Sequence, residues 1–307
     1  MIVPVPAVMR VFYTDRFEFP LPPGHRFPVR KYRRLRERVQ AEGIVRRERL
    51  LVPDAASDAE LRLVHTDPYL HDVVDGRLRP SAVRRIGFPW SPELVERSRR
   101  SVGATIAACR AALEHGVGAS LAGGTHHAFP AWGEGYCVFN DVAVAVRVLQ
   151  HEGLLHRVLV VDLDVHQGNG TAAIFAHDAA VTTYDVYADG NYPFAKVPSD
   201  VAVAVPDGTG DAVYLATLQR TLPAALQRSR PELVLYLAGA DPYEGDRLGR
   251  LRLTKAGLAA RDRWVLDACR AAGVPVAVTM AGGYAHDIED TVAIHLETVR
   301  LATGSAP

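Results

Sequence analysis

Residues that could do chemistry follow three of the short apolar runs in this chain. Asp164 and His166 follow one run, Asp241 follows a second, and His126 and His127 follow a third. In an open parallel sheet, ligands bind in the crevice outside the carboxyl ends of the strands. Two aspartates and one histidine form a ligand set for a divalent metal that keeps a position open for water or substrate. The pattern therefore predicts metal-dependent hydrolysis at one edge of a sheet.

The elements that must position these residues are predicted to be buried strands. The strands fall on apolar runs rich in Val, Leu and Ala, at residues 117–123, 157–163, 180–186, 233–239 and 274–280. Runs of this kind are typical of parallel strands that are covered on both faces. Helical segments lie between the runs, and this alternation favours one doubly wound α/β domain.

Helix boundaries can be placed from capping residues and glycines. A helix is predicted from Ser91 to about Leu113, and a second one begins at Thr254 and ends before Gly273. Pro223 is expected to kink or shorten the helix that lies between them. The turn-rich residues 187–210 predict a loop over the strand ends, and loops of this length tend to be functional.

Composition limits the class of protein. The 307 residues include 35 basic and 35 acidic side chains, and this balance gives no global field that would attract nucleic acid or an anionic membrane. No run reaches the roughly 18 apolar residues of a membrane span, and Met1–Met9 lacks the pattern of a signal peptide. The cysteines Cys109, Cys137 and Cys269 lie far apart, which argues against disulfides and favours the cytoplasm. We expect one domain over residues 1–307, and the oligomeric state stays open.

The strongest local signal is the pattern Asp162-Leu163-Asp164-Val165-His166. Strand alternation would place its three ionisable side chains on one face, where burial is costly without a compensating cation. The alternative is a salt-bridged strand end. Asp241 alone would be interpreted as a turn former, but with Asp164 and His166 it completes a metal site. Tyr284 follows two glycines and is either a half-buried aromatic residue or a phenol donor at this edge.

Several blocks together resemble the zinc-dependent histone deacetylase superfamily, most closely its class IV and the bacterial histone deacetylase-like amidohydrolases. The blocks occur in the order of the family, at residues 123–129, 135–141, 162–171, 239–249 and 282–284, and residues 24–32 and 64–69 are similar to its N-terminal part. The resemblance implies the arginase-like fold, a single α/β domain with a central, mainly parallel sheet and helices on both faces. It also implies an active site at the C-terminal ends of the strands.

The resemblance implies a role for each chemical residue. The zinc ligands would be Asp164, His166 and Asp241. His127 would be the general base, and His126 would be its electrostatic or proton-transfer partner. Tyr284 would polarise the scissile carbonyl. Asp162 would stand beside His126, and together with Asp185 it falls where the family holds a structural potassium ion. Asn169 would be the partner of His127, where class I members carry an aspartate and class II and IV members share the asparagine. A neutral partner should lower the pKa of His127.

The same resemblance describes a substrate tunnel. Tyr136 and Tyr192 would form its aromatic walls, and the Gly135 carbonyl would accept the substrate amide proton. Leu248 stands where polyamine-specific members carry a gatekeeping glutamate. The segment Ile86–Trp90 has no counterpart of the rim aspartate that grips peptide backbone in class I and II enzymes. These departures argue against polyamines and histone tails as substrates.

The resulting hypothesis is a zinc amidohydrolase that converts an acyl-lysine, or a related small acylated amine, to a free amine and a carboxylate. One alternative is an acetylpolyamine-type amidohydrolase. An arginase-type ureohydrolase with two manganese ions would need a second Asp-x-Asp pair, which Asp241-Pro242-Tyr243 does not supply. A non-catalytic acyl-lysine binding module would have lost a ligand, a histidine or Tyr284, and all are present. Acyl-chain length and the choice between Zn²⁺ and Fe²⁺ stay open.

Overall fold

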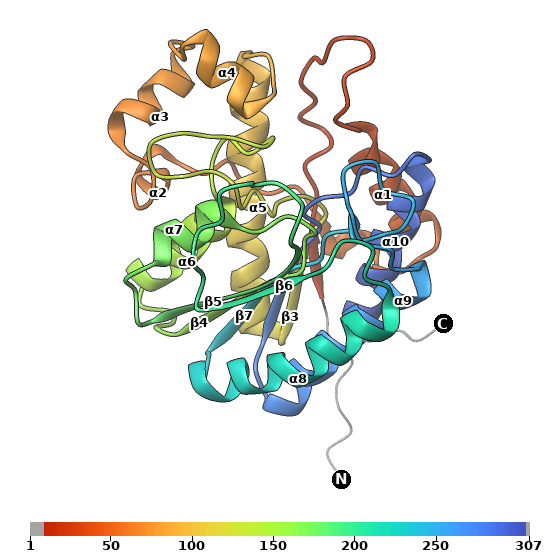
Figure 1. Ribbon diagram of the computed structural model, residues 1–307. Coiled ribbons are helices and arrows are strands. Elements are labelled where there is room, and N and C mark those ends of the chain that lie inside the picture. Colours follow the sequence, from red (N-terminus) through yellow and green to blue (C-terminus); the bar gives the residue numbers. More distant parts are fainter. Residues whose placement is uncertain (1–8, 305–307) are drawn as a thin grey trace.

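A parallel sheet forms the centre of the molecule (Figure 1). In the computed structural model, which describes residues 9–304, its strands are β1 (Arg10–Phe12), β2 (Leu50–Leu51), β3 (Val117–Ser120), β4 (Val158–Asp162), β5 (Val181–Ala188), β6 (Val201–Val205), β7 (Leu233–Leu237) and β8 (Val276–Thr279). They pair in the order β2-β1-β3-β8-β7-β4-β5-β6, and every pair is parallel. The carboxyl ends of all eight strands therefore meet at one edge, the upper one in Figure 1.

Helices cover both faces of this sheet. They are α1 (Arg30–Ala41), α2 (Asp58–Leu61), α3 (Asp67–Val74), α4 (Pro80–Ile86), α5 (Pro92–His115), α6 (Asp141–His151), α7 (Asn169–Phe175), α8 (Asp211–Ser229), α9 (Lys255–Ala272) and α10 (Ile288–Ala302), with a 3-10 turn at Arg47–Arg49. One apolar core lies between the sheet and α1, α8, α9 and α10. A second core lies between the opposite face and α2 to α7. The predicted α/β fold with helices on both faces is confirmed.

The central strands are buried on both sides, as their composition predicts. In β4, Leu159 and Val161 belong to the first core, whereas Val158 and Val160 belong to the second. Alternate side chains of one strand thus fill two cores, which explains why the sequence shows a continuous apolar run and no alternation.

The five predicted strands correspond to β3, β4, β5, β7 and β8, and three further strands escaped the sequence analysis. The predicted loop at residues 187–210 is wrong in part, because β5 extends to Ala188 and β6 occupies Val201–Val205. β6 is an edge strand whose side chains alternate between partly buried and exposed, and its short apolar run, Val-Ala-Val-Ala-Val, lies inside the turn-rich segment that was predicted to be a loop. The strands β1 and β2 contain only three and two residues.

The capping residues place the helices correctly. Ser91 Oγ accepts a hydrogen bond from Leu94 N at the start of α5, and Thr254 Oγ1 accepts one from Gly257 N at the start of α9. Pro223 does not shorten α8, which continues to Ser229. Its neighbours Leu222 and Leu226 are buried in the first core, and this packing offsets the hydrogen bond that the proline removes. None of the helices in the described part is both long and apolar enough to cross a bilayer.

Arg261 of α9 ties two strand ends together behind the predicted site. Its guanidinium is fully buried and donates from Nη1 to the carbonyl oxygens of Gly239 (2.7 Å) and Leu163 (3.2 Å). Its Nε donates to Asp262 Oδ1 (2.8 Å), which balances the charge. The two carbonyls belong to the segments that carry Asp241 and Asp164. Helix α9 therefore holds the two acidic segments at a set separation.

We expect Arg261→Met to lower the free energy of unfolding by about 3–5 kcal/mol, because it leaves Asp262 as an unpaired buried charge. Urea denaturation measures this change. Arg270→Met on the same helix removes an exposed pair with Asp267 and should cost less than about 1 kcal/mol. Equal losses in the two variants would show that Arg261 has no special structural role.

Candidate active site

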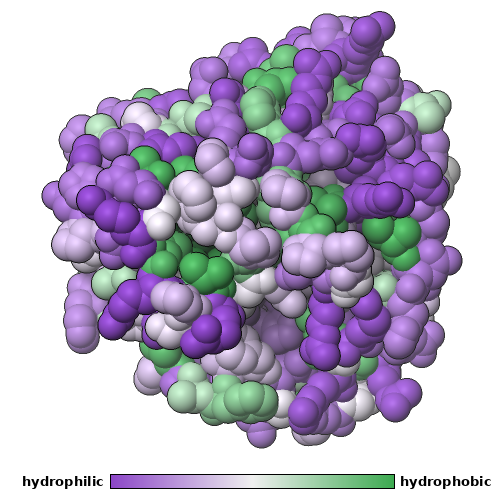
Figure 2. Space-filling view, turned by 90° about the horizontal axis from the view of Figure 1, so that it is seen from above, coloured by the Kyte–Doolittle hydropathy of each residue, from purple (hydrophilic) through white to green (hydrophobic). Residues whose placement is uncertain are grey.

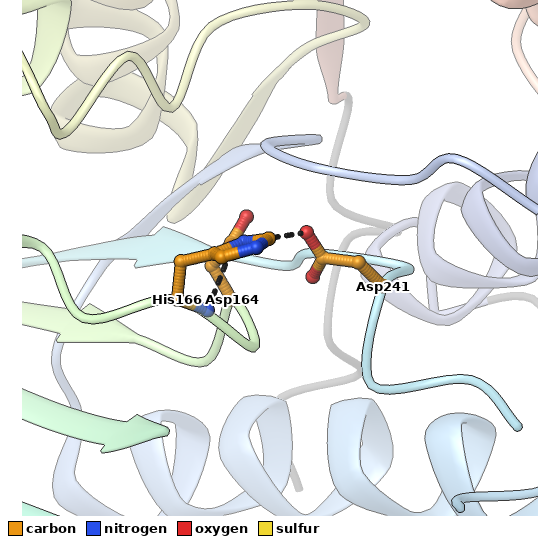
Figure 3. Close-up of side chains that lie close together, drawn as sticks. All are labelled: Asp164, His166 and Asp241. Atoms are coloured by element: carbon orange, nitrogen blue, oxygen red, sulfur yellow. Dashed lines mark hydrogen bonds and ion pairs between the residues drawn. The ribbon is translucent and has the colours of Figure 1, made fainter. Parts of the chain in front are cut away.

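Asp164, His166 and Asp241 converge beyond the ends of β4 and β7 (Figure 3). His166 Nδ1 lies 2.9 Å from Asp164 Oδ1 and 3.4 Å from Asp241 Oδ2. The potential ligand atoms of the three residues all lie within 4.8 Å of one another. Asp241 Oδ2 is buried, and no donor offers it a hydrogen bond of good geometry. Two carboxylates, one imidazole and an orphaned oxygen fit a divalent cation such as zinc.

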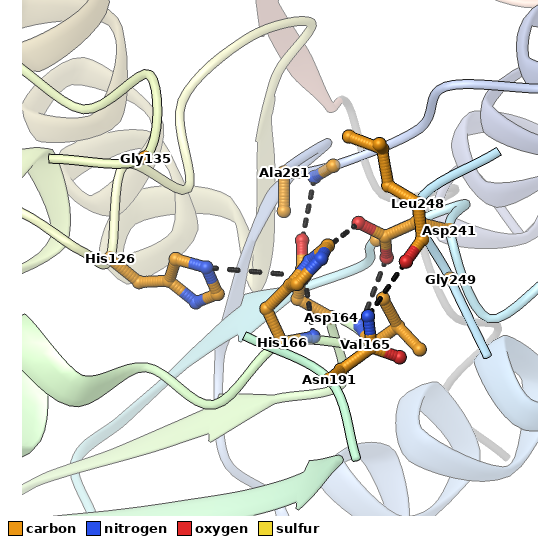
Figure 4. Close-up of polar contacts among 12 residues, drawn as sticks. His126, Gly135, Asp164, Val165, His166, Asn191, Asp241, Leu248, Gly249 and Ala281 are labelled. Carbon is orange, nitrogen blue, oxygen red and sulfur yellow. Dashed lines mark hydrogen bonds and ion pairs between the residues drawn. The ribbon is translucent and has the colours of Figure 1, made fainter. Parts of the chain in front are cut away.

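The backbone orients these ligands by donating to their remaining oxygens (Figure 4). Val165 N donates to Asp241 Oδ1 (3.0 Å), His166 N to Asp164 Oδ1 (2.9 Å), and Gly282 N to Asp164 Oδ2 (2.8 Å). These bonds require a bend after β4, which ends at Asp162. The expectation that strand alternation aligns Asp162, Asp164 and His166 is therefore wrong. Asp162 stays next to the ligand cluster through this bend, because its Oδ1 accepts from Asp164 N (3.1 Å).

The ligand cluster carries an excess of negative charge. Burial and the neighbouring Asp164 carboxylate raise the pKa of Asp241 to about 7. Burial disfavours a charged His166, but its hydrogen bonds and ion pairs with Asp164 and Asp241 outweigh burial and raise its pKa to about 10. In the absence of a bound cation, the two carboxylates therefore keep His166 protonated. A bound divalent ion would balance the same charge and replace that proton.

His126 and His127 lie side by side with unlike partners. Their ring centroids are 4.1 Å apart; His126 Nδ1 donates to Asp162 Oδ2 (2.6 Å) and His127 Nδ1 to Asn169 Oδ1 (2.7 Å). Burial opposes charge on His126, but Asp162 and Asp164 outweigh it and raise the pKa to about 9. Burial and the neighbouring His126 lower the pKa of His127 well below its usual range. Such opposed shifts make His127 a neutral base beside a protonated His126.

Tyr284 lies at the same edge, on the loop after β8. Burial, together with the Asp164 and Asp241 carboxylates, raises its pKa well above the usual range, so it stays a phenol that can donate a hydrogen bond. Its backbone is held by Asp246, whose Oδ2 accepts from Tyr284 N (2.6 Å). Lys31 Nζ donates to the carbonyls of Ala281 (3.3 Å) and Gly283 (3.2 Å) in the same loop.

A cavity of about 450 Å³ lies at the strand ends, and its lining includes His126, His127, Asp164, His166 and Tyr284. The expected tunnel residues Gly135, Tyr136, Tyr192 and Leu248 are all part of its lining. The Tyr192 ring meets His127 edge-on, with centroids 5.0 Å apart. Viewed from above, the molecular surface is hollowed near its middle, and hydrophobic residues gather around the hollow (Figure 2). The cavity combines an apolar passage with a polar end.

Asp162 and Asp185 occupy paired positions on neighbouring strands β4 and β5. Burial and the charge of Asp162 raise the pKa of Asp185 to about 7. Its Oδ1 accepts from Gly168 N (3.0 Å). Two adjacent buried carboxylates fit the expectation of a second cation, and the potassium assignment stays a prediction.

Three residues at the site were missed by the sequence analysis. Lys31 holds the tyrosine loop from α1, Glu134 accepts from Asn169 Nδ2 (2.8 Å), and His65 supports the histidine loop. His65 Nδ1 donates to Phe129 O (3.1 Å), and its Nε2 accepts from Asn140 N (3.0 Å). Each contacts a partner far away in the sequence or on a different loop. All three lay within or next to segments that resemble the family: Lys31 in residues 24–32, His65 in residues 64–69 and Glu134 beside the tunnel residue Gly135.

Comparisons with known proteins show the family and the fold. A family model described as histone deacetylase domain matches residues 25–299. The chain is 31% identical to Histone deacetylase 2 of Arabidopsis thaliana over 285 residues, covering 90% of this chain and 73% of that protein. It is 31% identical to the histone deacetylase-like amidohydrolase of Pseudomonas aeruginosa over 287 residues, covering 86% and 74%. A solved histone deacetylase homologue complexed with SAHA superposes with a TM-score of 0.85 at 22% identity, covering 97% of this chain and 84% of that one, and shows the same fold.

The ligand cluster predicts a tightly bound metal. Protein purified without chelators should contain about one equivalent of zinc per chain by elemental analysis. Removing it should lower the melting temperature, because buried carboxylates then lose their compensating cation. Asp241→Asn should abolish both the metal content and the response to added Zn²⁺, whereas Glu48→Gln at an exposed site should preserve both. Metal-free protein with unchanged stability would contradict the assignment.

His65 predicts a specific acid sensitivity. Burial lowers its pKa to about 4, whereas the unfolded chain takes up this proton near 6.5. Between these values the unfolded state binds more protons, so stability falls as the pH is lowered through this window, by up to about 3 kcal/mol. We expect His65→Gln to remove this part of the pH dependence in urea denaturation from pH 7 to pH 4. His71→Gln, at an exposed position, should leave the profile unchanged; a parallel loss there would refute the assignment.

Proposed function

The chain belongs to the histone deacetylase family, and we propose that it is a zinc-dependent amidohydrolase that hydrolyses an acyl-lysine or a related acylated amine. One observation carries the proposal. Asp164 and His166, which form the ligand cluster with Asp241, line the same cavity as two histidines whose pKa values are shifted in opposite directions. A site of this kind can hold a metal, remove a proton from water and return a proton to a leaving amine.

Asp164, His166 and Asp241 would hold the metal, and when bound it would supply Lewis acidity toward the amide carbonyl and the attacking water. The neutral His127 takes the proton of the attacking water on Nε2, because Nδ1 is engaged with Asn169 Oδ1. Asn169 Oδ1 then accepts a hydrogen bond from the imidazolium. The negative charge of Asp162 keeps His126 protonated at the start of the reaction.

The remaining steps follow from the protonation states. As water attacks, the carbonyl oxygen gains negative charge, and the Tyr284 phenol donates a hydrogen bond to it. The carbon–nitrogen bond then breaks as a protonated histidine gives its proton to the departing amine. His127 is the nearer source, since it has just received the proton from water, and His126 stabilises the developing charge. The products are an amine and a carboxylate.

The cavity favours a single extended alkyl amine as the leaving group. Phe27 and Tyr136 lie in ring contact at 5.3 Å and form an apolar passage suited to a lysine side chain. Arg84, Arg85 and Arg250 also line the cavity, and Leu248 offers no charge to pair with a second ammonium group. Arg250 is paired with Asp207 (3.0 Å), but the exposed Arg84 and Arg85 would repel polyamines and strongly basic peptides. We therefore favour acyl-lysine in a neutral or acidic peptide, or a small acylated amine with one amino group.

We further propose that Asp162 and Asp185 hold a structural potassium ion below the histidine pair. Such an ion would offset the repulsion that raises the pKa of Asp185. We place the reaction in the cytoplasm, because Cys109, Cys137 and Cys269 are buried free thiols.

The test is a turnover screen of the metal-loaded protein. Acyl-lysine peptides with acidic or basic flanks and different chain lengths would be compared with acetylated mono- and polyamines. We expect hydrolysis of acyl-lysine, faster with acidic flanks, and little turnover of acetylpolyamines. Tyr284→Phe should lower kcat roughly 100-fold with little loss of stability, since it removes one donor to the oxyanion. Tyr243→Phe, outside the cavity, should change kcat less than about twofold. Absence of turnover on every substrate, or full activity of Tyr284→Phe, would overturn the proposal.

A further inference from the structure

Glu134 is a carboxylate that none of the catalytic steps above uses, yet three side chains donate to it, one of which lines the cavity. Its Oε1 accepts from Asn169 Nδ2 (2.8 Å) and from the Tyr192 hydroxyl (2.7 Å), and its Oε2 accepts from Trp132 Nε1 (3.2 Å). One of these donors is the partner of the general base. Another, Tyr192, packs edge-on against that same base.

An ionised carboxylate can only accept hydrogen bonds, whereas an asparagine amide has an accepting end and a donating end of similar shape. Because Glu134 faces Asn169, the amide must turn its NH₂ group toward Glu134 and its Oδ1 toward His127. Oδ1 in turn requires a proton on His127 Nδ1, 2.7 Å away. With the proton on Nδ1, the free lone pair of the ring is on Nε2. The Glu134 carboxylate therefore acts through the Asn169 amide to keep His127 Nε2 able to accept a proton.

The opposite amide orientation shows what Glu134 prevents. With the amide turned over, Oδ1 would face a carboxylate oxygen at 2.8 Å, and two acceptors would oppose each other. The NH₂ group would then donate to His127 Nδ1, which would move the imidazole proton to Nε2. In that tautomer His127 could not take a proton from water. The loop that carries Glu134 packs directly against the His127 ring. A Cβ added at Gly135, the residue after Glu134, would lie 2.7 Å from His127 Cδ2.

We propose that Glu134 is a positioning residue that keeps His127 in its Nδ1-protonated tautomer by orienting the Asn169 amide. This inference rests on the proposed function, in which His127 Nε2 takes the proton from water. Glu134 does not touch the substrate in this role. Its hydrogen bond to Tyr192 also places the tunnel wall beside His127, so one carboxylate aligns the base and the passage that leads to it.

Glu134→Gln tests the role of the acceptor-only group, because glutamine has nearly the same shape but can present a donor. The introduced amide can turn its NH₂ group toward Asn169, which permits the wrong orientation of the Asn169 amide. We expect kcat to fall about tenfold, from loss of a charge-assisted hydrogen bond and of the correct tautomer, with a smaller change in KM. Trp132→Phe is the matched control, since it removes another donor to Glu134 but keeps the stacking on Phe129. Its kcat should change less than about twofold.

The sharper test changes the partner. In Asn169→Asp, a carboxylate oxygen would face Glu134 Oε1 and repel it, while the other oxygen still accepts from His127. Glu134→Gln should then raise kcat several-fold over Asn169→Asp alone, because glutamine donates to the new carboxylate. Glu134→Gln should thus lower kcat in the wild-type background and raise kcat in the Asn169→Asp background. An equal loss in both backgrounds, or an equal loss in Trp132→Phe, would show that Glu134 only packs the loop and would overturn the proposal.

A second measurement does not depend on turnover. In metal-loaded protein labelled with ¹⁵N-histidine, the His127 signals can be assigned by their loss in His127→Gln. We expect the wild-type ring to be protonated at Nδ1 and Glu134→Gln to show a share of the Nε2-protonated form. An unchanged tautomer in Glu134→Gln would overturn the inference even if the enzyme is active. Inactivity of the wild-type protein on all acyl amines, with the tautomer shift present, would instead reject only the proposed function.

Discussion

Repulsion among buried carboxylates is the constraint on which the rest of this structure depends. Asp162, Asp164, Asp185 and Asp241 are all buried at the carboxyl edge of the sheet, where unpaired charge is costly. Their mutual repulsion contributes to the raised pKa values of Asp185 and Asp241. Backbone N–H groups stabilise part of this charge, and imidazolium groups or bound metal ions would balance the rest. Cation binding at the acidic edge would therefore also stabilise the fold.

The surrounding backbone is adapted to the same cluster. A Cβ on Gly282 would lie 1.9 Å from Asp241 Oδ2, and one on Gly168 would lie 2.5 Å from Asp162 Oδ2. The glycines let backbone N–H groups reach the carboxylates, as Gly282 N does to Asp164. On the opposite side, Arg261 holds the two ligand segments by their carbonyl oxygens and does not contact the ligands themselves. The guanidinium therefore sets the separation of the ligands without neutralising them.

The sequence analysis succeeded where the local pattern of residues is enough to indicate their place in the fold. Apolar runs identify the central strands because both faces of the sheet are covered, and the polar residues after them must then meet at one edge. It failed where tertiary contacts decide. β6 was missed because its short apolar run lies within a turn-rich segment and forms a strand only by pairing with β5, and the bend after Asp162 is set by hydrogen bonds to Asp162 and Asp241. Lys31 and Glu134 could not be assigned, because their partners at the site come from distant segments.

The unlike partners of the two histidines follow from the same electrostatics. Asp162 contacts His126 directly and keeps it protonated, and a second direct carboxylate would do the same to His127. Two imidazolium rings 4.1 Å apart would repel each other and leave no base. An amide between His127 and Glu134 retains the orientation that a carboxylate imposes while weakening its field at the ring. Glu134 thus sets the direction of the hydrogen bond between Asn169 and His127, whereas the neutral amide keeps the negative charge of the carboxylate away from the ring.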